Sequence, residues 1–192
     1  MRLIAITGGI GSGKSVVARI VQVMGYSVYD CDSRAKSLML HDDEVKRQLV
    51  DAFGKETYHG DGTINKEHLS KMAFADDQTL KRLNAIVHPA TASDMLRWAD
   101  TQASKGVAVT FIETALLRTA GLDKMVDEVW HVTAPVELRI TRVMARSGLT
   151  SAQVKERISA QAQEEAVAEC EKEIINTDDS PLLPRIIKLL KN

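Results

Sequence analysis

Short apolar runs alternate with amphipathic stretches at both ends of the chain. Five runs have the length and composition of β-strands, and they are Leu3–Thr7, Tyr26–Asp30, Gly106–Glu113, Asp127–Ala134 and Glu173–Thr177. The third run is nearly all apolar, which is typical of a strand covered on both faces of its sheet. This alternation predicts an α/β fold, with a parallel five-stranded sheet and helices on both faces.

The middle of the chain has a different pattern, with helical periodicity and little strand character from about Ser33 to Asp94. Asn65 is expected to cap a helix that runs to Phe74, and Asp76 is expected to cap the next one. The apolar face of that second helix consists of Leu80, Leu83, Ile86 and Val87. Because the stretch is too long for a simple crossover between two strands, it predicts an inserted helical subdomain that covers the substrate.

Further signals mark where helices begin and end. The pair His88-Pro89 is expected to end one helix and to start another. Thr150 and Gln153 have capping-box spacing before an amphipathic run. Ser180-Pro181 is expected to start a last helix, Leu182–Lys191, which packs on the sheet.

The composition and charge of the chain argue against several classes of protein. The chain has 192 residues and a formal net charge of −1, which argues against bulk electrostatic binding to nucleic acid or to an anionic membrane. The first apolar run breaks at Gly8, so no signal peptide is expected, and no stretch approaches the roughly 20 apolar residues that span a bilayer. Cys31 and Cys170 have no metal-ligand spacing and argue against a disulfide framework. These features predict a cytoplasmic protein.

Four glycines, Gly8, Gly9, Gly11 and Gly13, crowd six residues between the first strand and the first helix. With Lys14 and Ser15 they complete the spacing of a phosphate-binding loop, Gly8-x4-Gly13-Lys14-Ser15. A loop that wraps around a polyphosphate turns its N–H groups inward, and Cβ atoms would obstruct that turn. A plain glycine turn between a strand and a helix needs neither the lysine nor the serine.

The loop therefore predicts a nucleoside triphosphate as ligand, bound by residues from Gly8 to Val16 with Ser12 among them. Lys14 is expected to reach the β- and γ-phosphates, and the Ser15 hydroxyl is expected to ligate Mg²⁺. A GTPase would need Asn-Lys-x-Asp after a late strand, and the closest stretch, Asn176–Asp179, lacks the lysine. A mechanical ATPase is usually larger, so these features favour a kinase.

The chain resembles the dephospho-coenzyme A kinase family over nearly its full length. The motifs that carry the resemblance are TGGIGSGKS at 7–15, YDCDSRAK at 29–36, FADDQTLKRLNAIVHP at 74–89, Arg142 and Arg146 with RISAQ at 157–161, and EIINT at 173–177. The family has Pro-Leu-Leu-Phe-Glu after its third strand, whereas this chain has Ala115–Thr119, with the sequence ALLRT. Any role of that family glutamate therefore does not carry over.

The resemblance implies ATP-dependent phosphorylation of the ribose 3′-hydroxyl of dephospho-coenzyme A. Asp32 matches the second aspartate of the family motif, and a carboxylate there can accept the hydroxyl proton or orient the hydroxyl for in-line attack. Thr7 and His88 are further expected contacts of the acceptor, with helix-end packing as the alternative for His88. Asp30 is expected to be mainly a structural or metal-shell carboxylate.

The resemblance also implies roles on the ATP side. Arg142 and Arg146 lie four residues apart, on one face of a predicted helix, and guanidinium groups pair well with phosphate oxygens. Both match the family's lid and are expected to be catalytic, with Arg146 and Asn176 also binding the nucleotide. Glu113 is expected to hold Mg²⁺ through water, with a solvated loop carboxylate as the alternative. Arg139 is predicted as an ordinary solvated arginine.

The expected organisation is one P-loop kinase unit of residues 1–192. Its core comprises about 1–32, 106–135 and 172–192, with a helical insertion on the coenzyme A side at about 33–105 and a lid at about 136–171. Trp98 and Trp130 are predicted in the core, and His131 as an ordinary surface or packing residue. We expect a monomer that uses ATP and Mg²⁺. A kinase of another small acceptor, such as a nucleoside or sugar, and a non-catalytic nucleotide-binding regulator remain alternatives.

Overall fold

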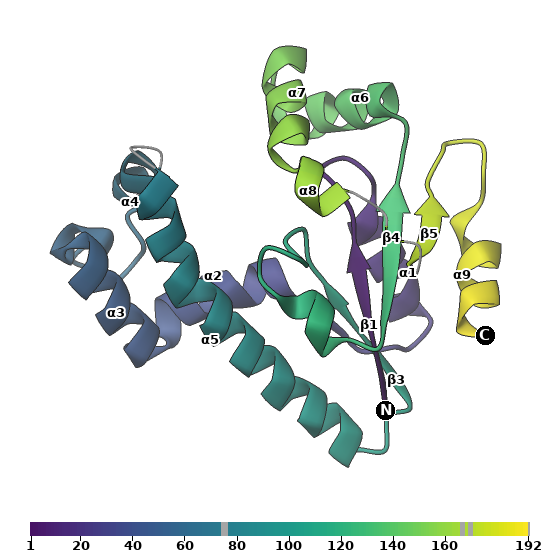
Figure 1. Cartoon of the computed structure of the whole chain (residues 1–192), viewed down its shortest axis with the longest axis horizontal. Coiled ribbons are helices and arrows are strands. Elements are labelled where there is room, and N and C mark those ends of the chain that lie inside the picture. Colours follow the sequence, from purple (N-terminus) through teal and green to yellow (C-terminus); the bar gives the residue numbers. More distant parts are fainter. Residues whose placement is uncertain (74–76, 166–167, 169–170, 192) are drawn as a thin grey trace. The chain divides into compact units, whose positions relative to one another are not determined.

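Five parallel strands form one sheet in the part of the chain that the structure describes, in the order β2-β3-β1-β4-β5 (Figure 1). Their bounds are Arg2–Thr7 for β1, Val28–Asp30 for β2, Val109–Glu113 for β3, Glu128–Thr133 for β4 and Lys172–Ile175 for β5. All neighbouring strands run parallel. The predicted fold class is confirmed, although β2 and β3 begin two or three residues later than the apolar pattern suggests.

The computed structural model describes residues 1–73, 77–165, 168 and 171–191. The predicted cap Asp76, the predicted helix end Phe74 and the second cysteine, Cys170, lie outside these residues. The chain divides into two compact units, one of Met1–Asp30 with Ala99–Asn192 and the other of Cys31–Trp98. No described helix has an apolar stretch long enough to cross a membrane.

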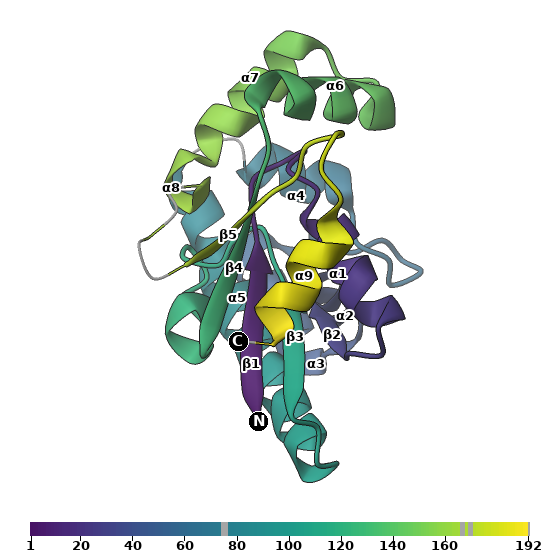
Figure 2. The same ribbon diagram turned by 90° about the vertical axis from the view of Figure 1, so that its right-hand side faces the viewer.

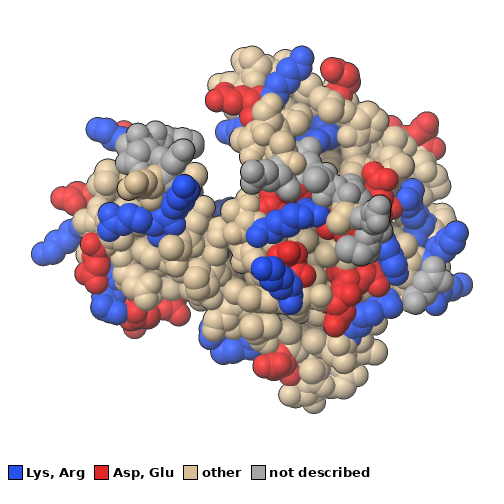
Figure 3. Space-filling model, viewed as in Figure 1, with Lys and Arg blue, Asp and Glu red and all other residues tan. Residues whose placement is uncertain are grey.

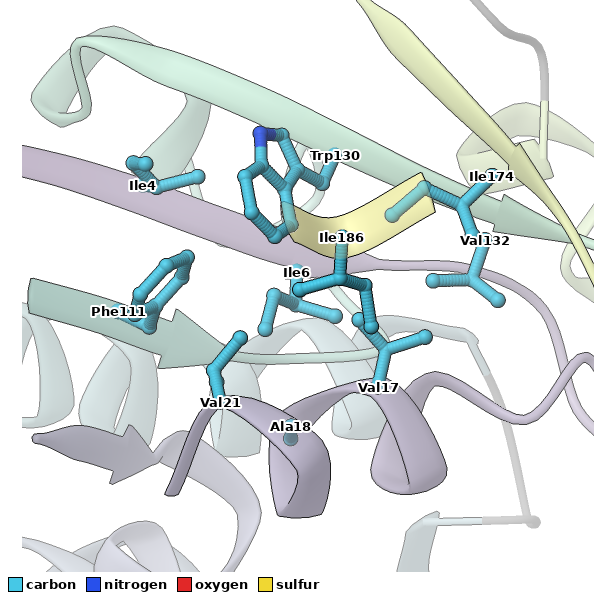
Figure 4. Close-up of a cluster of buried hydrophobic side chains, with 10 residues drawn as sticks. All are labelled: Ile4, Ile6, Val17, Ala18, Val21, Phe111, Trp130, Val132, Ile174 and Ile186. Carbon is cyan, nitrogen blue, oxygen red and sulfur yellow. The ribbon is translucent and has the colours of Figure 1, made fainter. Parts of the chain in front are cut away.

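The core of the sheet unit lies between the strands and two helices, α1 (Lys14–Val23) and α9 (Leu182–Leu190) (Figure 4). Side chains from both helices and from four strands meet there, namely Ile4, Ile6, Val17, Ala18, Val21, Phe111, Trp130, Val132, Ile174 and Ile186. Trp130 is fully buried, as predicted, and meets Phe111 edge to face at a centroid distance of 5.1 Å. Burial of Ile186 confirms that the last helix packs on the sheet, on the side of α1 (Figure 2).

Three further helices of this unit follow β4. They are α6 (Val136–Ser147), α7 (Ser151–Ala160) and the short α8 (Ala162–Glu165), and a 3₁₀ turn, η2 (Leu122–Met125), precedes β4. The predicted capping box at the start of α7 is confirmed, because the Thr150 hydroxyl accepts from the Gln153 N–H and the Gln153 side chain accepts from the Thr150 N–H. Both α6 and α7 lie beyond the carboxyl ends of β1 and β4 (Figures 1 and 2).

The second unit is built from helices. Its elements are α2 (Cys31–His41), α3 (Asp43–Phe53), the 3₁₀ turn η1 (Lys55–Thr57), α4 (Lys66–Ala73) and most of α5 (Asp77–Ser104). Asn65 caps α4 as predicted, since its Oδ1 accepts a hydrogen bond of 3.0 Å from the N–H of His68. The core of the unit is a cluster of Val45, Leu49, Phe53 and Leu69.

The prediction that His88-Pro89 ends a helix is wrong. Helix α5 runs without a break through Pro89, although an interior proline removes a backbone hydrogen bond and costs about 3 kcal/mol or more. Leu83 and Ile86 before the proline and Ala90 after it pack against the same buried cluster. Packing of these half-buried apolar side chains on both sides of Pro89 offsets part of the cost, and the helix stays continuous.

Candidate functional site

The carboxyl ends of the strands bring the loop and two acidic residues to one edge of the sheet. Thr7 ends β1, and the glycine loop follows it directly into α1, which begins at Lys14. Glu113 ends β3 and pairs in register with Asp30, the last residue of β2. Ligands of parallel α/β sheets gather at this edge, because loops and helix N-termini open there.

Glycines of the loop allow other parts of the chain to approach its backbone. Gly11 and Gly13 have φ angles of 79° and 91°, which residues with a Cβ rarely adopt. A Cβ on Gly11 would lie 2.7 Å from the carbonyl oxygen of Arg139, and one on Gly13 would lie 2.0 Å from the Asn176 Nδ2. Gly11 is therefore required by its contact with α6, and Gly13 by its contact with the loop after β5. The positive φ angles of the turn require glycine at both positions as well.

A cavity of about 440 Å³ opens above the loop. Its floor consists of loop and first-turn residues, and its walls come from the segment after β3 and from the helices after β4. The lining residues are Gly9, Ile10, Gly11, Gly13, Lys14, Ser15, Val16, Ala115, Arg142, Val143, Arg146 and Gln161. The cavity thus combines the N-terminus of a helix with three cationic side chains, which suits a polyphosphate.

Lys14 is held by an acidic partner. Its Nζ lies 3.7 Å from Oε1 of Glu113, and the side chains are only 20% and 15% exposed. The pair orients the lysine beneath the cavity. It also places a carboxylate beside the first turn of α1, where the predicted metal ligand Ser15 lies.

The two predicted arginines of α6 both line the cavity, as one helix face requires. Arg142 donates 3.3 Å to the Asn176 carbonyl oxygen and 2.7 Å to the Asp178 carboxylate. Arg146 lies one turn further along α6, is exposed, and makes no ion pair with any residue that the structure describes. Arg142 is thus fixed in place, whereas Arg146 retains its donors for a ligand.

Asn176 is buried, and its side chain contacts the loop. Its Nδ2 donates a hydrogen bond of 2.7 Å to the carbonyl oxygen of Ser12. This contact keeps the loop against the segment after β5, while the predicted contact of Asn176 with nucleotide stays a prediction.

In the same segment, hydrogen bonds from Thr177 and the local backbone lower the pKa of the Asp179 carboxyl below its usual value.

The prediction that Arg139 is a solvated surface residue is wrong. Its residue exposure is 6%, and its Nε donates 2.8 Å to the carbonyl oxygen of Ile10 in the loop. The helical period offered a signal, because Arg139 stands next to the buried Ile140 and four residues before the buried Val143. Gln161, whose Oε1 accepts 2.8 Å from the Ile10 N–H, is a second loop contact that sequence reasoning assigned no role.

Two hydroxyls at the loop are buried. Thr7 and Ser12 are fully or almost fully buried, and neither hydroxyl has a hydrogen-bond partner among the described residues. Gly8, also in the predicted set, packs against the backbone of β4, since a Cβ there would lie 2.3 Å from the Val132 carbonyl oxygen.

The remaining predicted acceptor residues belong to the helical unit. Asp32 lies in the first turn of α2 and is exposed, and His88 is half-buried in α5. His131 is a packing residue rather than a surface one, because it is 1% exposed with its Nδ1 3.0 Å from the Glu171 carboxylate.

The chain is similar to known proteins of one family over most of its residues. The sequence model of the dephospho-CoA kinase family matches residues 2–181. The dephospho-CoA kinase of Geobacter sulfurreducens is 39% identical over 182 residues, covering 94% of this chain and 92% of the relative. That of Porphyromonas gingivalis is 34% identical, covering 100% and 94%. The solved structure of TT1252 from Thermus thermophilus is 32% identical, covers 99% of this chain and 96% of its own, and superposes with a TM-score of 0.78.

Proposed function

The chain belongs to the dephospho-CoA kinase family, which performs the last step of coenzyme A synthesis. We propose that its cavity binds the ATP whose γ-phosphoryl group is transferred to dephospho-CoA. The reaction moves the γ-phosphoryl group to the ribose 3′-hydroxyl and yields ADP and coenzyme A. The cavity itself carries the proposal, because loop glycines, Lys14 and two arginines of α6 line one space of about 440 Å³.

Different residues of the cavity contact different parts of ATP. The loop from Gly8 to Val16 binds the phosphates through backbone N–H groups, with the N-terminus of α1 beneath them. Lys14 contacts the β- and γ-phosphates, and Arg142 and Arg146 neutralise charge on the group in transfer. Asn176 keeps the loop in shape through Ser12 and belongs to the nucleotide site in that sense.

The oxygen donors beside Lys14 fit a magnesium ion. Ser15 supplies a hydroxyl and Glu113 a carboxylate, and Mg²⁺ is commonly held by one or two protein oxygens together with substrate phosphates and water. When bound, the ion supplies charge neutralisation on the phosphate oxygens. Glu113 contacts Lys14 as well, so its carboxylate orients the lysine whether or not it also holds the metal through water.

On the acceptor side we propose that Asp32 orients the 3′-hydroxyl and accepts its proton, and that Thr7 and His88 contact dephospho-CoA. The helical insertion at about 33–105 is proposed to serve the acceptor. The segment of about 136–171 is proposed as a lid that excludes water and so limits wasteful hydrolysis of ATP. A monomer in the cytoplasm completes the proposal.

The deciding experiment measures ATP consumption with and without dephospho-CoA, alongside a panel of nucleosides and sugars. We expect turnover with dephospho-CoA alone, and a product that mass spectrometry and phosphorus NMR identify as the 3′-phosphate. Turnover with another acceptor would support a different small-molecule kinase. Binding of ATP with no acceptor turned over would support a regulator instead.

A loop variant tests the assignment of the cavity in the same assay. Lys14→Ala should lower turnover by at least about a hundredfold, the scale of losing one preorganised charge contact. Lys155→Ala on the exposed surface of α7 is the matched control and should leave turnover unchanged. Turnover of the folded Lys14→Ala protein at the rate of the unmodified chain would refute the assignment.

A further inference from the structure

We propose that Ile10 couples the phosphate-binding loop to α6 and α7, so that nucleotide bound by the loop also fixes α6 and, with it, the exposed Arg146. Ile10 is then a positioning residue, with Arg139 and Gln161 as its partners. The inference rests on the proposed function only in taking ATP as the ligand of the loop.

Both backbone groups of Ile10 are bound by residues from beyond β4. Its N–H donates 2.8 Å to Oε1 of Gln161, and its carbonyl oxygen accepts 2.8 Å from Nε of Arg139. Arg139 is a buried cation, and hydrogen bonds from a charged donor are roughly twice as strong as neutral ones. The middle of the loop is therefore attached to α6 on one side and to the end of α7 on the other.

The side chain of Ile10 adds a third attachment. It packs against a buried cluster of Ile140, Val143 and Val154, which Leu149 and Ile158 also border. Apart from Ile10, every described member of this cluster comes from α6, α7 or the turn between them. The loop thus inserts one apolar residue into the core of the predicted lid.

The same helix carries the two arginines of the cavity. Val143 belongs to the cluster that Ile10 packs against, while Arg142 beside it and Arg146 one turn later line the space above the loop. Ile10 stands between Gly9 and Gly11, which let the loop adjust around a phosphate. Any displacement of Ile10 on binding must be followed by α6 or must break its three attachments. Coupling of this kind is reciprocal, so α6 also influences the affinity of the loop.

Hydrogen–deuterium exchange of the 192-residue chain, with ATP and without dephospho-CoA, tests the coupling. In the unmodified protein, ATP should slow exchange both in the loop at 8–16 and in α7 at 151–160. In Ile10→Ala, ATP should still slow exchange in the loop but much less in α7, because the side-chain contact is lost while the backbone bonds to Gln161 and Arg139 remain. The ATP dissociation constant should rise by about 5–150-fold, the usual range of such couplings. Lys155→Ala is the control and should behave as the unmodified chain.

A second variant keeps the test valid if Ile10→Ala does not fold. Gln161→Met preserves side-chain length but removes the acceptor for the Ile10 N–H, and it should also reduce the protection of α7. Gln161→Glu retains that acceptor and should restore the protection, even though its charge weakens ATP binding.

The two proposals fail in different ways. Failure of the unmodified chain to bind ATP would overturn the proposed function. Full protection of α7 by ATP in folded Ile10→Ala or Gln161→Met would overturn the coupling alone.

Discussion

At the scale of single residues, Gly13 has no room for a side chain. A Cβ would meet the Asn176 amide at 2.0 Å, and that amide already holds the Ser12 carbonyl oxygen. Gly13→Ala should therefore displace Asn176 or the loop and lower turnover by at least about a hundredfold, comparable with losing a preorganised contact. Steady-state kinetics of the purified variant measure the effect.

Gly25→Ala is a close control for this change. Gly25 has a similar φ of 95° but no neighbouring atom within 4 Å of the added Cβ. Both variants carry a backbone strain of about 1–2 kcal/mol, whereas only the change at Gly13 disturbs the site. Equal losses of activity in the two variants would show that strain alone is responsible.

The role of Asp32 can be separated from its size. Asp32→Asn keeps the shape of the side chain but removes the charge and the proton acceptor. Turnover should fall by roughly a hundredfold or more, within the usual contribution of general base catalysis, while the affinity for ATP stays nearly unchanged. Isothermal titration with ATP and turnover assays with dephospho-CoA test both parts. Collapse of ATP binding would assign Asp32 to the nucleotide or the metal instead.

At the scale of elements, α6 carries three arginines with three different surroundings. Arg139 binds the loop backbone, Arg142 is tied to the segment after β5, and Arg146 is exposed at the cavity. Under the proposed role, Arg146 contacts the phosphoryl group only in the transition state, so Arg146→Ala should lower turnover and catalytic efficiency together, with little change in ATP affinity. Arg146→Lys should restore little, since a point charge does not reproduce paired donors.

The control for this experiment must be chosen from the structure. Arg139→Ala is unsuitable, since it removes a support of the loop, whereas Arg19→Ala changes an exposed residue of α1. If the kinetics of Arg146→Ala match those of Arg19→Ala, Arg146 is a solvated surface residue with no role in catalysis.

A second element-scale feature is the departure from the family pattern at Ala115–Thr119. The backbone N–H groups of Arg118 and Thr119 donate to the Glu164 carboxylate at 2.9 Å and 2.6 Å, and the Arg118 guanidinium pairs with Glu171. The carboxylates that anchor this segment therefore come from α8 and from the residue before β5. Glu171 also contacts His131, so one buried carboxylate serves two cationic or polar partners.

Arg118→Met should leave Glu171 without its charged partner. We expect the free energy of unfolding to fall by about 1.5–3 kcal/mol, the usual contribution of a hydrogen bond to a charged group. Urea denaturation measures the change, with Arg19→Met as an exposed control. A loss no larger than that of the control would show that the pair contributes nothing.

At the scale of the whole molecule, acidic and basic side chains are interspersed over the face in Figure 3. The chain divides into a sheet unit that contains the cavity and a helical unit. A ligand that binds the folded state stabilises it by an amount set by its concentration over its dissociation constant. ATP is therefore expected to stabilise the sheet unit directly.

Thermal unfolding followed by tryptophan fluorescence can report this stabilisation. Trp98→Phe leaves Trp130, in the core of the sheet unit, as the sole tryptophan. ATP with Mg²⁺ at about a hundred times the dissociation constant contributes about 2.7 kcal/mol, which corresponds to an increase in Tm of roughly 5–10 °C for a chain of this length. Lys14→Ala at the same ATP concentration should show a much smaller increase. An equal increase in both proteins would contradict the nucleotide site.

Prediction from the sequence succeeded where neighbours along the chain decide the outcome. The strands, the caps at Asn65 and Thr150, and the glycine loop follow from apolar period, side-chain capping and turn chemistry, all within a few residues. It failed at Pro89, where local chemistry favours a helix end but a buried cluster keeps α5 intact. Burial of apolar area in a distant packing partner outweighed the local preference.

The sequence by itself determined the fold class, the phosphate loop and the family, because each follows from short patterns of residues that are close together along the chain. The tertiary structure alone decided which polar residues support that loop. Arg139 reaches Ile10 across 129 positions, Gln161 reaches it across 151, and Asn176 reaches Ser12 across 164. A hydrogen bond depends on distance in space, and only the packing of α6, α7 and the segment after β5 around the loop brings these pairs within 3 Å.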